Sequence, residues 1–374
     1  MLTHAAPSIE NLKHLFASVP ETPALLIDLK VLRSDFLDFK RSFAGSRICY
    51  AIKANSHPEI LTELYALGCD FEISSLGELH HLQSLGIRGD RIISSNPIKS
   101  PLFIREAYAA GLRHFVFDSK AEVDKLAELA PNSSPCIRLT VPNEGSEWPL
   151  DKKFGVGPEM ALQLLLLAKA KGLKPAGVTF HIGSQNRELE GWPIALRIVR
   201  DLWDKAKKKG IRLNTLNIGG GMPVYYTNPD FPSVAEIAKT VAATRDTLFP
   251  AGVETFLEPG RAMVARAGTI VTTVVGVADR DGTRWVYIDT GIFQGLAEAL
   301  GGIKYRYLTH ASGPVEQCTL AGPSCDSMDT IARDVMLPQV KVGDRIAIPA
   351  CGAYTTSYNT DFNGFPGPRV ITVG

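Results

Sequence analysis

Residues 47–53 read Arg-Ile-Cys-Tyr-Ala-Ile-Lys, a short apolar run that ends in a lysine. Its length and its aromatic and β-branched content are typical of a buried strand. An ammonium group is costly to bury without a partner, and desolvation lowers the pKa of a lysine. We therefore predict at Lys53 a buried, nucleophilic amine that reacts with an aldehyde near neutral pH. The alternative is a lysine whose charged end reaches solvent along its aliphatic stem.

Seven further strand-like runs follow this one, with helical segments between most of them. The eight predicted strands lie at about residues 48–53, 69–74, 91–95, 113–117, 135–140, 176–181, 213–218 and 253–257. Apolar residues at helical spacing occupy 58–67, 77–85, 101–110, 120–129, 158–171 and 233–248. Eight alternations of strand and helix predict a closed (β/α)8 barrel of the TIM type, because open doubly wound sheets usually have fewer strands.

The sequence changes character after residue 265. Apolar runs such as 269–275, 285–288 and 345–348 follow one another without convincing helices between them. This pattern favours a mainly antiparallel β domain, and the run 22–28 reads as a further strand that joins it. We therefore expect residues 30–265 to form the barrel, and residues 1–29 together with 266–374 to form the β domain.

The composition argues against several functional classes. The 374 residues include 40 Lys and Arg and 39 Asp and Glu, and a net charge of +1 disfavours a nucleic-acid or anionic-membrane surface. The six cysteines show no CxxC pair and no metal-ligand spacing, so we expect reduced thiols, no metal site and a cytoplasmic protein. Neither a signal-peptide pattern nor an apolar run of ~18 residues is present, so secretion and membrane insertion are not expected.

The barrel prediction gathers the chemically useful residues at one end. Active sites in such barrels form at the carboxyl ends of the strands. The polar residues at these ends are Lys53, Ser74, Ser75, Asn96, Asp118, Arg138, His181 and Glu258. One polar loop residue is weak evidence of function, but so many on a single rim predict an active site there.

A phosphate site is predicted beside this rim. Gly219-Gly220-Gly221 follow the strand at 213–218, and glycines allow backbone N–H groups to approach a phosphate closely. Ser184 follows the preceding strand, and Gly260 and Arg261 follow the next one. Together these residues suit one dianionic phosphate group. A dinucleotide fingerprint and a Walker loop are both absent from the sequence.

Glu258 ends the eighth predicted strand and suggests a heteroaromatic coenzyme. A carboxylate that faces a pyridine nitrogen keeps this nitrogen protonated, and the pyridinium ring then accepts the electron pair released when a bond at Cα breaks. A structural ion pair with Arg261 is the alternative explanation for Glu258. The lysine and the phosphate site favour the coenzyme interpretation.

As an ordered set, the motifs resemble a known enzyme family. They are residues 50–55 (Tyr-Ala-Ile-Lys-Ala-Asn), 181–185 (His-Ile-Gly-Ser-Gln), 219–221 (Gly-Gly-Gly), 258–261 (Glu-Pro-Gly-Arg), 325–326 (Cys-Asp) and 362–365 (Phe-Asn-Gly-Phe). The set resembles the decarboxylases of the alanine-racemase fold (fold type III), which depend on pyridoxal 5'-phosphate (PLP). Within them the chain is most similar to the ornithine, lysine and diaminopimelate decarboxylase group, from about residue 22 to its end.

The resemblance implies a role for each matching residue. Lys53 would carry PLP as an internal aldimine, Glu258 would pair with the ring nitrogen, and His181 would stack on the ring. The residues that would bind the phosphate are Ser184, Gly219, Gly220, Gly221, Gly260, Arg261 and Tyr354. The charged residues that match positions near the coenzyme or the barrel mouth are Glu72, Glu78, Arg138 and Lys153. The ornithine branch more often has aspartate in place of Glu72.

The resemblance also implies a homodimer with shared active sites. Cys325 would donate the proton that replaces carbon dioxide, and Asp326 would contact the distal amine of the substrate, both contributed by the partner subunit. The aromatic residues that would line the substrate pocket are Phe293, Tyr354 and Phe362. Cys325 could instead be a small apolar residue in a buried turn, although burying the neighbouring aspartate without a cation would be costly.

The implied reaction is decarboxylation of a basic L-amino acid, most closely ornithine, to a diamine of the putrescine type. Gly301-Gly302 stand near the position where the ornithine enzymes usually have an acidic residue, and an unpaired buried ammonium costs several kcal/mol. Lysine, diaminopimelate, carboxynorspermidine or another amino acid therefore remains an alternative substrate. A racemase and a PLP-binding homologue without catalysis are further alternatives, which Glu258 and the pair Cys325-Asp326 respectively disfavour.

Overall fold

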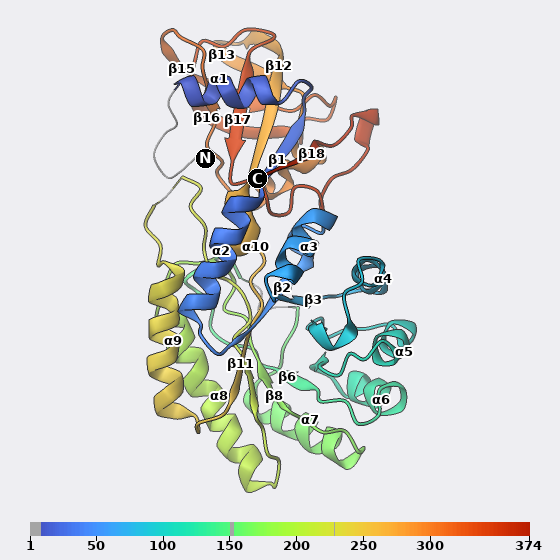
Figure 1. Cartoon of the computed structure of the whole chain (residues 1–374). Helices are drawn as coiled ribbons and strands as arrows, with labels where there is room; N and C mark the ends of the chain where they lie inside the picture. The colour runs from blue at the N-terminus through green and yellow to red at the C-terminus, as the bar shows by residue number, and fades with distance from the viewer. Residues whose placement is uncertain (1–8, 150–152, 228) are drawn as a thin grey trace. The chain divides into compact units, whose positions relative to one another are not determined.

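The computed structural model describes residues 9–149, 153–227 and 229–374, so residues 1–8 of the expected β domain lie outside the described chain. The chain forms two compact units, shown in Figure 1 and described here one at a time. Unit 1 comprises Met1–Ser34, Val224–Pro229 and Met263–Gly374, and unit 2 comprises Asp35–Pro223 and Asp230–Ala262.

Unit 2 is a barrel of parallel strands. These strands are β2 (Arg47–Ala51), β3 (Asp70–Glu72), β4 (Ile92–Ile93), β5 (Val116–Phe117), β6 (Cys136–Arg138), β8 (Gly177–Thr179), β10 (Thr215–Asn217) and β11 (Glu254–Leu257). Their order in the sheet is β4-β3-β2-β11-β10-β8-β6-β5. A parallel bridge between Ser94 and Phe115 joins the two edge strands, β4 and β5, and closes the ring. All eight predicted strands and the barrel itself are therefore confirmed.

One helix, α2 (Leu29–Ser42), precedes the first barrel strand, and the other helices follow strands of unit 2 (Figure 1). The others are α3 (Pro58–Ala66), α4 (Leu76–Ser84), α5 (Pro101–Ala109), α6 (Lys120–Leu129), α7 (Pro158–Ala170), α8 (Gly191–Lys208) and α9 (Val234–Leu248). Serine hydroxyls at 75, 100, 119 and 233 each accept a backbone N–H of the first turn, which fixes where α4, α5, α6 and α9 begin. The predicted helical ranges are confirmed, but they omit α2 and α8.

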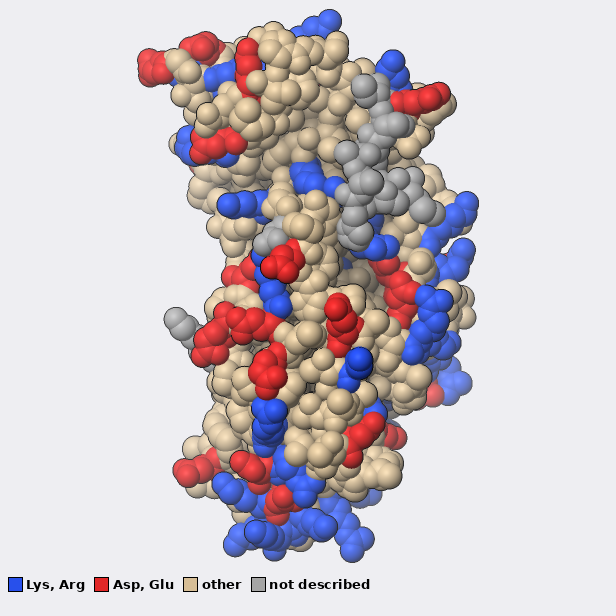
Figure 2. All heavy atoms as spheres, turned by 90° about the vertical axis from the view of Figure 1, so that its left-hand side faces the viewer, with Lys and Arg blue, Asp and Glu red and all other residues tan. Residues whose placement is uncertain are grey.

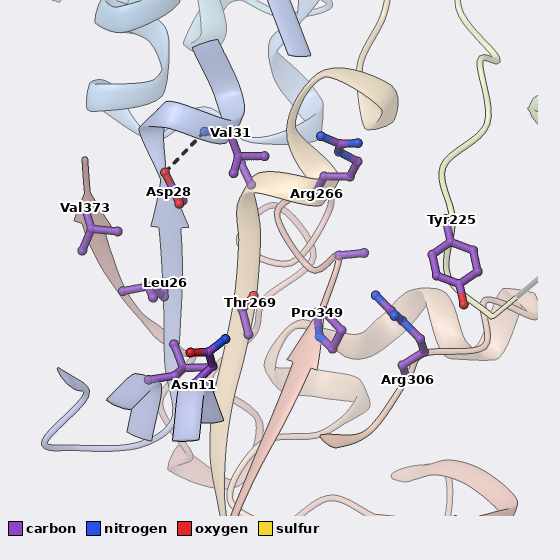
Figure 3. Close-up of a pocket in the computed structure, with 13 residues that line it drawn as sticks. Asn11, Leu26, Asp28, Val31, Tyr225, Arg266, Thr269, Arg306, Pro349 and Val373 are labelled. Carbon is purple, nitrogen blue, oxygen red and sulfur yellow. Dashed lines mark hydrogen bonds between the residues drawn. The ribbon is translucent and has the colours of Figure 1, made fainter. Parts of the chain in front are cut away.

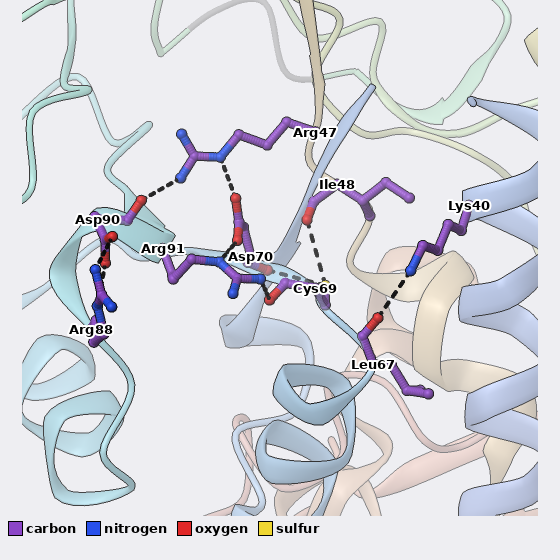
Figure 4. A network of polar contacts seen from close by, with 9 residues as sticks. All are labelled: Lys40, Arg47, Ile48, Leu67, Cys69, Asp70, Arg88, Asp90 and Arg91. Atoms are coloured by element: carbon purple, nitrogen blue, oxygen red, sulfur yellow. Dashed lines mark hydrogen bonds and ion pairs between the residues drawn. The ribbon is translucent and has the colours of Figure 1, made fainter. Parts of the chain in front are cut away.

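The amino-terminal ends of three neighbouring strands are joined by charged side chains (Figure 4). The Nε groups of Arg47, which begins β2, and Arg91, which precedes β4, each donate to a different carboxylate oxygen of Asp70 at the start of β3. Arg47 also donates to the Asp90 carbonyl at 2.8 Å, and Arg91 donates to the Cys69 carbonyl at 3.0 Å. This network holds together the barrel end opposite to the predicted active site.

Unit 1 contains a mainly antiparallel sheet. Its strands are β1 (Ala24–Asp28), β12 (Gly268–Arg280), β13 (Thr283–Ile288), β14 (Leu308–Thr309), β15 (Val315–Ala321), β16 (Thr330–Pro338), β17 (Arg345–Pro349) and β18 (Arg369–Val373). Only β1–β18 and β13–β15 are parallel among the described strand pairs of this sheet. The early strand β1 pairs with both β12 and β18, so the predicted β fold and its amino-terminal strand are confirmed.

Smaller elements complete the two units. In unit 1, α1 (Ile9–Ser18) packs Leu12 and Phe16 against Val271 and Ala347 of the sheet. In unit 2, β7 (Ser146–Trp148) and β9 (Ser184–Asn186) form an antiparallel ribbon. The short helix α10 (Arg261–Val264) begins in unit 2, and its last two residues belong to unit 1. The spacing analysis predicts neither α1 nor the ribbon.

Acidic and basic side chains are interspersed over most of the face shown in Figure 2, as the balanced composition suggests. Basic groups gather at the lower end of unit 2 (Figure 2), where the last turn of α8 carries Lys205, Lys207 and Lys208. Cations at a helix carboxyl terminus interact favourably with the helix dipole, so this cluster needs no ligand to explain it. Among the described helices, none combines the length and the hydropathy needed to cross a bilayer.

Candidate functional site

Lys53 lies in a short 3-10 turn, Ile52–Ala54, directly after β2. Ile52 and Ala54 are fully buried, so the backbone on both sides of the lysine is held in the barrel. The lysine side chain itself is 54% exposed, and its Nζ lies 3.9 Å from Oε2 of Glu72. The prediction of a buried amine is therefore wrong, because the turn directs the side chain out of the core while its attachment point stays fixed.

Two buried or half-buried carboxylates, Glu72 and Glu258, are linked through one serine. Glu72 ends β3 and is 2% exposed, and its Oε1 accepts the backbone N–H of Ser95 at 3.3 Å. The hydroxyl of the same Ser95 donates to Oε1 of Glu258, which follows β11. Burial raises the pKa of Glu72 to about 7, the charge of Lys53 opposes this shift, and the charge of Glu258 adds to it.

Asn217, the last residue of β10, connects Glu258 to the glycine turn. Its Nδ2 donates to Oε1 of Glu258 at 2.5 Å, and its Oδ1 accepts the backbone N–H of Gly219 at 2.9 Å. The sequence reasoning missed both Ser95 and Asn217. Their only sequence signal is their place at the carboxyl end of a predicted strand.

The three glycines are required by the neighbouring strand ends. A Cβ at Gly219 would stand 2.3 Å from the carbonyl oxygen of Phe180, and one at Gly220 would stand 2.6 Å from that of Glu258. A Cβ at Gly221 would stand 2.3 Å from the carbonyl oxygen of Gly183. Gly219 and Gly221 also have positive φ angles of 65° and 97°. Close backbone packing thus explains these glycines by itself, and the absence of Cβ atoms lets a ligand approach the backbone of the turn closely.

His181 follows β8 and is held in one orientation. Its Nδ1 accepts the backbone N–H of Gly183 at 3.0 Å, so the proton of the neutral ring is on Nε2. Burial, together with the positive charges of Arg138 and Lys53, lowers the pKa of His181 to about 3. The ring is therefore neutral at physiological pH, which suits stacking on an aromatic ligand.

Arg138, a predicted rim residue, and Glu78, which matches a charged position of the family, are two further ionisable residues of this site. Burial lowers the pKa of Arg138, at the end of β6, although the carboxylates of Glu258, Asp118 and Glu72 oppose the shift. Glu78 accepts the backbone N–H of Ser74 at 2.6 Å, and burial raises its pKa.

A further predicted rim residue, Asp118, and a further residue that matches the family, Lys153, lie on neighbouring loops. Asp118 accepts the Gly155 N–H at 2.9 Å. The Lys153 ammonium lies 5.1 Å from the ring centroid of Phe154. Their contacts are consistent with roles in loop structure.

The predicted phosphate residues of unit 2 lie on three segments. Ser184 begins β9 and Arg261 begins α10, immediately after Gly260. The Arg261 guanidinium is buried and lies 5.8 Å from the ring centroid of Trp148 on β7. Tyr354 belongs to unit 1, where it has a φ of 60° and stacks on Tyr358 at 5.7 Å between ring centroids.

Unit 1 brings together the predicted residues of the substrate side. Cys325 and Asp326 are exposed on the loop between β15 and β16, so the buried turn considered for Cys325 is wrong for this chain. The Cys325 thiol lies 3.3 Å from Oδ1 of Asn363, which neighbours Phe362. The rings of Phe293 and Phe362 are 4.5 Å apart between centroids.

A buried carboxylate, Asp329, organises this part of unit 1. Its Oδ1 accepts the Ile292 N–H at 2.7 Å and its Oδ2 accepts the Ser324 N–H at 3.0 Å. The segment that carries Phe293 is thereby tied to the loop that carries Cys325. Sequence reasoning missed Asp329 and gave no role to Asn363 of the motif 362–365, because the spacing of the motifs does not show which loops meet.

Comparison with known proteins decides the family. A sequence model described as "Pyridoxal-dependent decarboxylase, pyridoxal binding domain" matches residues 29–265. The chain belongs to the pyridoxal-dependent decarboxylases. The lysine/ornithine decarboxylase of Selenomonas ruminantium is 35% identical over 363 residues, which are 96% of this chain and 91% of that protein. The resemblance inferred from the motifs is confirmed, and this chain is a PLP-dependent amino-acid decarboxylase.

Two further comparisons extend over nearly the whole decarboxylase. The diaminopimelate decarboxylase of Helicobacter pylori is 32% identical over 372 residues, 95% of this chain and 91% of that protein. The solved structure of SrLDC in complex with PLP and cadaverine has a TM-score of 0.91 and 33% identity, covering 98% of this chain and 94% of that one. The relatives thus include decarboxylases of different amino acids.

The residues of unit 2 fit PLP. The glycine turn has no Cβ atoms to keep a phosphate away from its backbone, and the neutral His181 offers a flat face to the coenzyme ring. Among the described residues, no hydrogen bond reaches Oε2 of Glu258, which leaves this oxygen available to the ring nitrogen. The exposed amine of Lys53 is accessible to the aldehyde of the coenzyme.

A separate cavity of about 220 Å³ lies in unit 1 (Figure 3). Arg266, Arg306 and Tyr225 line one part of it, and the Arg306 guanidinium lies 4.6 Å from the ring centroid of Tyr225. Asp28 on another wall accepts the Lys30 N–H at 2.9 Å at the start of α2. None of the predicted site residues, all of which the structure describes, lines this cavity.

The raised pKa of Glu72 predicts how stability depends on pH. Because the folded pKa lies above the ordinary value of 4.5, the folded protein keeps a proton that the unfolded chain releases as the pH rises from 4.5 to 7. The ionised Glu72 carboxylate thus lowers the free energy of unfolding at higher pH. We expect the coenzyme-free Glu72→Gln variant to be more stable than the parent at pH 8 by ~2 kcal/mol, with a smaller difference at pH 5. Urea unfolding at both pH values tests this expectation, and an equal difference at both would contradict it.

Proposed function

We propose that this decarboxylase converts a basic L-amino acid, with ornithine or lysine as the first candidates, to the corresponding diamine and carbon dioxide. The main support for the proposal is that four functional side chains lie together at the carboxyl ends of the barrel strands in a chain of this family. They are Lys53, Glu72, His181 and Glu258. The 35% identity to a lysine/ornithine decarboxylase over 96% of the chain supports this choice of substrate class.

The residues of unit 2 would each contribute one function. PLP, when bound, supplies an electron-withdrawing ring that stabilises the charge left at Cα when carbon dioxide departs. Lys53 would bind the coenzyme aldehyde, and Oε2 of Glu258 would accept the ring N–H. Neutral His181 would cover one face of the ring and exclude water from it. Ser184, Gly260 and Arg261 would hold the phosphate together with the glycine turn.

We propose that Cys325 and Asp326 act on the substrate side, from the partner subunit of a homodimer. Their exposure on one loop supports this proposal, because a proton donor and an ammonium-binding carboxylate must both reach a ligand. The S–H group of Cys325 is oriented toward the Asn363 amide oxygen. One oxygen of Asp326 accepts the Met328 N–H at 2.8 Å, and no hydrogen bond from the described residues reaches the second, which would be available for a cation.

The distal part of the substrate is the least constrained. Position 302 is a glycine with a φ of 99°, so it contributes no acidic side chain to the pocket. Asp326 would then provide the charge that recognises a distal ammonium. Diaminopimelate is a second candidate substrate, because a diaminopimelate decarboxylase is 32% identical over 95% of the chain.

A substrate panel tests the proposed function. Purified protein with PLP is incubated with ornithine, lysine, arginine, diaminopimelate and carboxynorspermidine, and carbon dioxide release is measured. Release from ornithine or lysine at the highest kcat/KM supports the proposal, and preference for diaminopimelate selects the second candidate. A protein that exchanges the Cα proton without releasing carbon dioxide would be a racemase, and one that does neither would only bind PLP. The cytoplasmic location stays a prediction from the reduced cysteines.

Replacing Cys325 with alanine tests the proton donor. We expect the variant to bind PLP as the parent does and to form the diamine ~100-fold more slowly, because general-acid catalysis typically contributes this much or more. Cys318→Ala is a matched control, since this cysteine is 1% exposed in the strand β15. The measurement is diamine formed per enzyme under saturating substrate. Unchanged turnover in Cys325→Ala would remove this residue from the mechanism.

A further inference from the structure

We propose that Ser95 and Asn217 are positioning residues that fix the Glu258 carboxylate, so that Oε1 is occupied and Oε2 faces the coenzyme ring nitrogen. The inference rests on the proposed PLP-dependent function and adds two residues to its site. Both side chains are buried, with exposed fractions of 5% for Ser95 and 2% for Asn217. Both donate to the same oxygen of Glu258.

The two donors approach Glu258 from different strands. Asn217 ends β10, which is paired with β11, the strand that precedes Glu258. Ser95 follows β4, and two strands, β3 and β2, stand between β4 and β11 in the sheet order. The carboxylate is therefore held from an adjacent strand and from a more distant part of the ring. Two donors on different strands constrain both the position and the rotation of the group.

This constraint matters because the last torsion of a glutamate is soft. The terminal carboxylate torsion has a broad, roughly two-fold preference, so an unsupported carboxylate would turn either oxygen, or neither, toward the ring nitrogen. Occupation of Oε1 by two donors selects one orientation. A preorganised acceptor contributes more to a charged contact than one that must be ordered when the ligand binds.

The same two residues also connect Glu258 with the other contacts of the coenzyme. The backbone N–H of Ser95 donates to Glu72, the acid beside Lys53, and Oδ1 of Asn217 accepts the N–H of Gly219 in the glycine turn. Loss of either side chain would thus remove one of the two hydrogen bonds that hold the Glu258 carboxylate. The backbone contacts of Ser95 would remain in a Ser95→Ala variant, so that variant isolates the hydroxyl.

The test is a set of double-mutant cycles on PLP affinity. Each hydrogen bond to a charged group is typically worth a factor of about ten or more in binding, so we expect Ser95→Ala and Asn217→Ala each to raise the Kd for PLP about tenfold and to lower kcat with little change in KM. In the background of Glu258→Ala, which removes the carboxylate, Ser95→Ala should change the Kd less than twofold. Asn217→Ala should change it less than in the parent, because only the contact of Asn217 with the Gly219 N–H is then lost.

Matched controls separate this role from general damage to the barrel. The hydroxyls of Ser94 and Thr179 are buried and, among the described residues, have no hydrogen-bond partner. Ser94 precedes Ser95, and Thr179 pairs in register with Asn217. Ser94→Ala and Thr179→Val should leave the PLP affinity and kcat within twofold of the parent. If Ser95→Ala does not fold, Ser95→Cys keeps the volume and only a weak donor, and it takes its place.

The outcomes are distinct. If Ser95→Ala lowered the PLP affinity equally in the parent and in Glu258→Ala, the inference would be wrong. It would also be wrong if Ser94→Ala lowered the affinity as much as Ser95→Ala does. A parent protein that binds no PLP would instead overturn the proposed function. Coupling that disappears in the Glu258→Ala background supports the positioning role.

Discussion

Replacing Lys53 with alanine will lower kcat/KM for decarboxylation by at least ~10³-fold, the largest loss of activity that we expect from one substitution. The backbone of Lys53 is fixed by buried neighbours, while its amine is exposed beside a buried acid. Loss of this amine removes the group that binds the coenzyme aldehyde. The measurement is carbon dioxide release with the substrate that the panel identifies.

Covalent trapping tests the same residue without using activity. Borohydride treatment of the protein with PLP will attach the coenzyme to a peptide that contains Lys53, and mass spectrometry will find no such peptide in Lys53→Ala. Lys120→Ala is the control, because Lys120 is 72% exposed and pairs only with Asp124 among the described residues. We expect its activity and its labelling pattern to match the parent. A stable adduct at another lysine in the Lys53→Ala variant would defeat the assignment.

The fold was predictable because strand and helix alternate with a regular period. Apolar runs of strand or helix length, and serine caps before four of the helices, mark the elements locally. The barrel can therefore be predicted without knowledge of long-range contacts. The helix α8 has no such mark at its start. It follows Glu190, whose side chain makes no cap hydrogen bond, and it begins with Gly-Trp-Pro. Its helical state is supported by buried Trp192 and Trp203, which is tertiary information.

The site was predictable only in part, for a physical reason. Lys53, His181 and Glu258 are unusual residue types at strand ends, so they attract notice in the sequence. Ser95 and Asn217 are common residue types, and their importance depends on their hydrogen bonds to Oε1 of Glu258, which lies on another strand end of the barrel. Asp329 likewise acts through two backbone N–H groups from loops far apart in the sequence. The exposure of Lys53 depends on one 3-10 turn that the apolar pattern does not reveal.

The largest loss of stability is expected at the other end of the barrel, in the variant Asp70→Asn. Asp70 is 8% exposed and accepts hydrogen bonds from both Arg47 and Arg91 (Figure 4). Without the charge, two partly buried guanidinium groups lose their shared carboxylate, which typically costs about 3 kcal/mol or more. We expect the free energy of unfolding to fall by this amount in urea titrations at pH 7.

A surface ion pair provides the control for Asp70→Asn. Asp204 pairs with Arg200 at 2.8 Å within α8, and its side chain is 42% exposed, so Asp204→Asn should change the free energy of unfolding by no more than ~0.5 kcal/mol. Because Asp70 lies at the opposite ends of the strands from Lys53, the folded Asp70→Asn protein should keep its kcat within about twofold at 25 °C. Equal unfolding free energies for the two variants would show that the network contributes no more than a surface pair, and the amino-terminal barrel end would then be held by its apolar core alone.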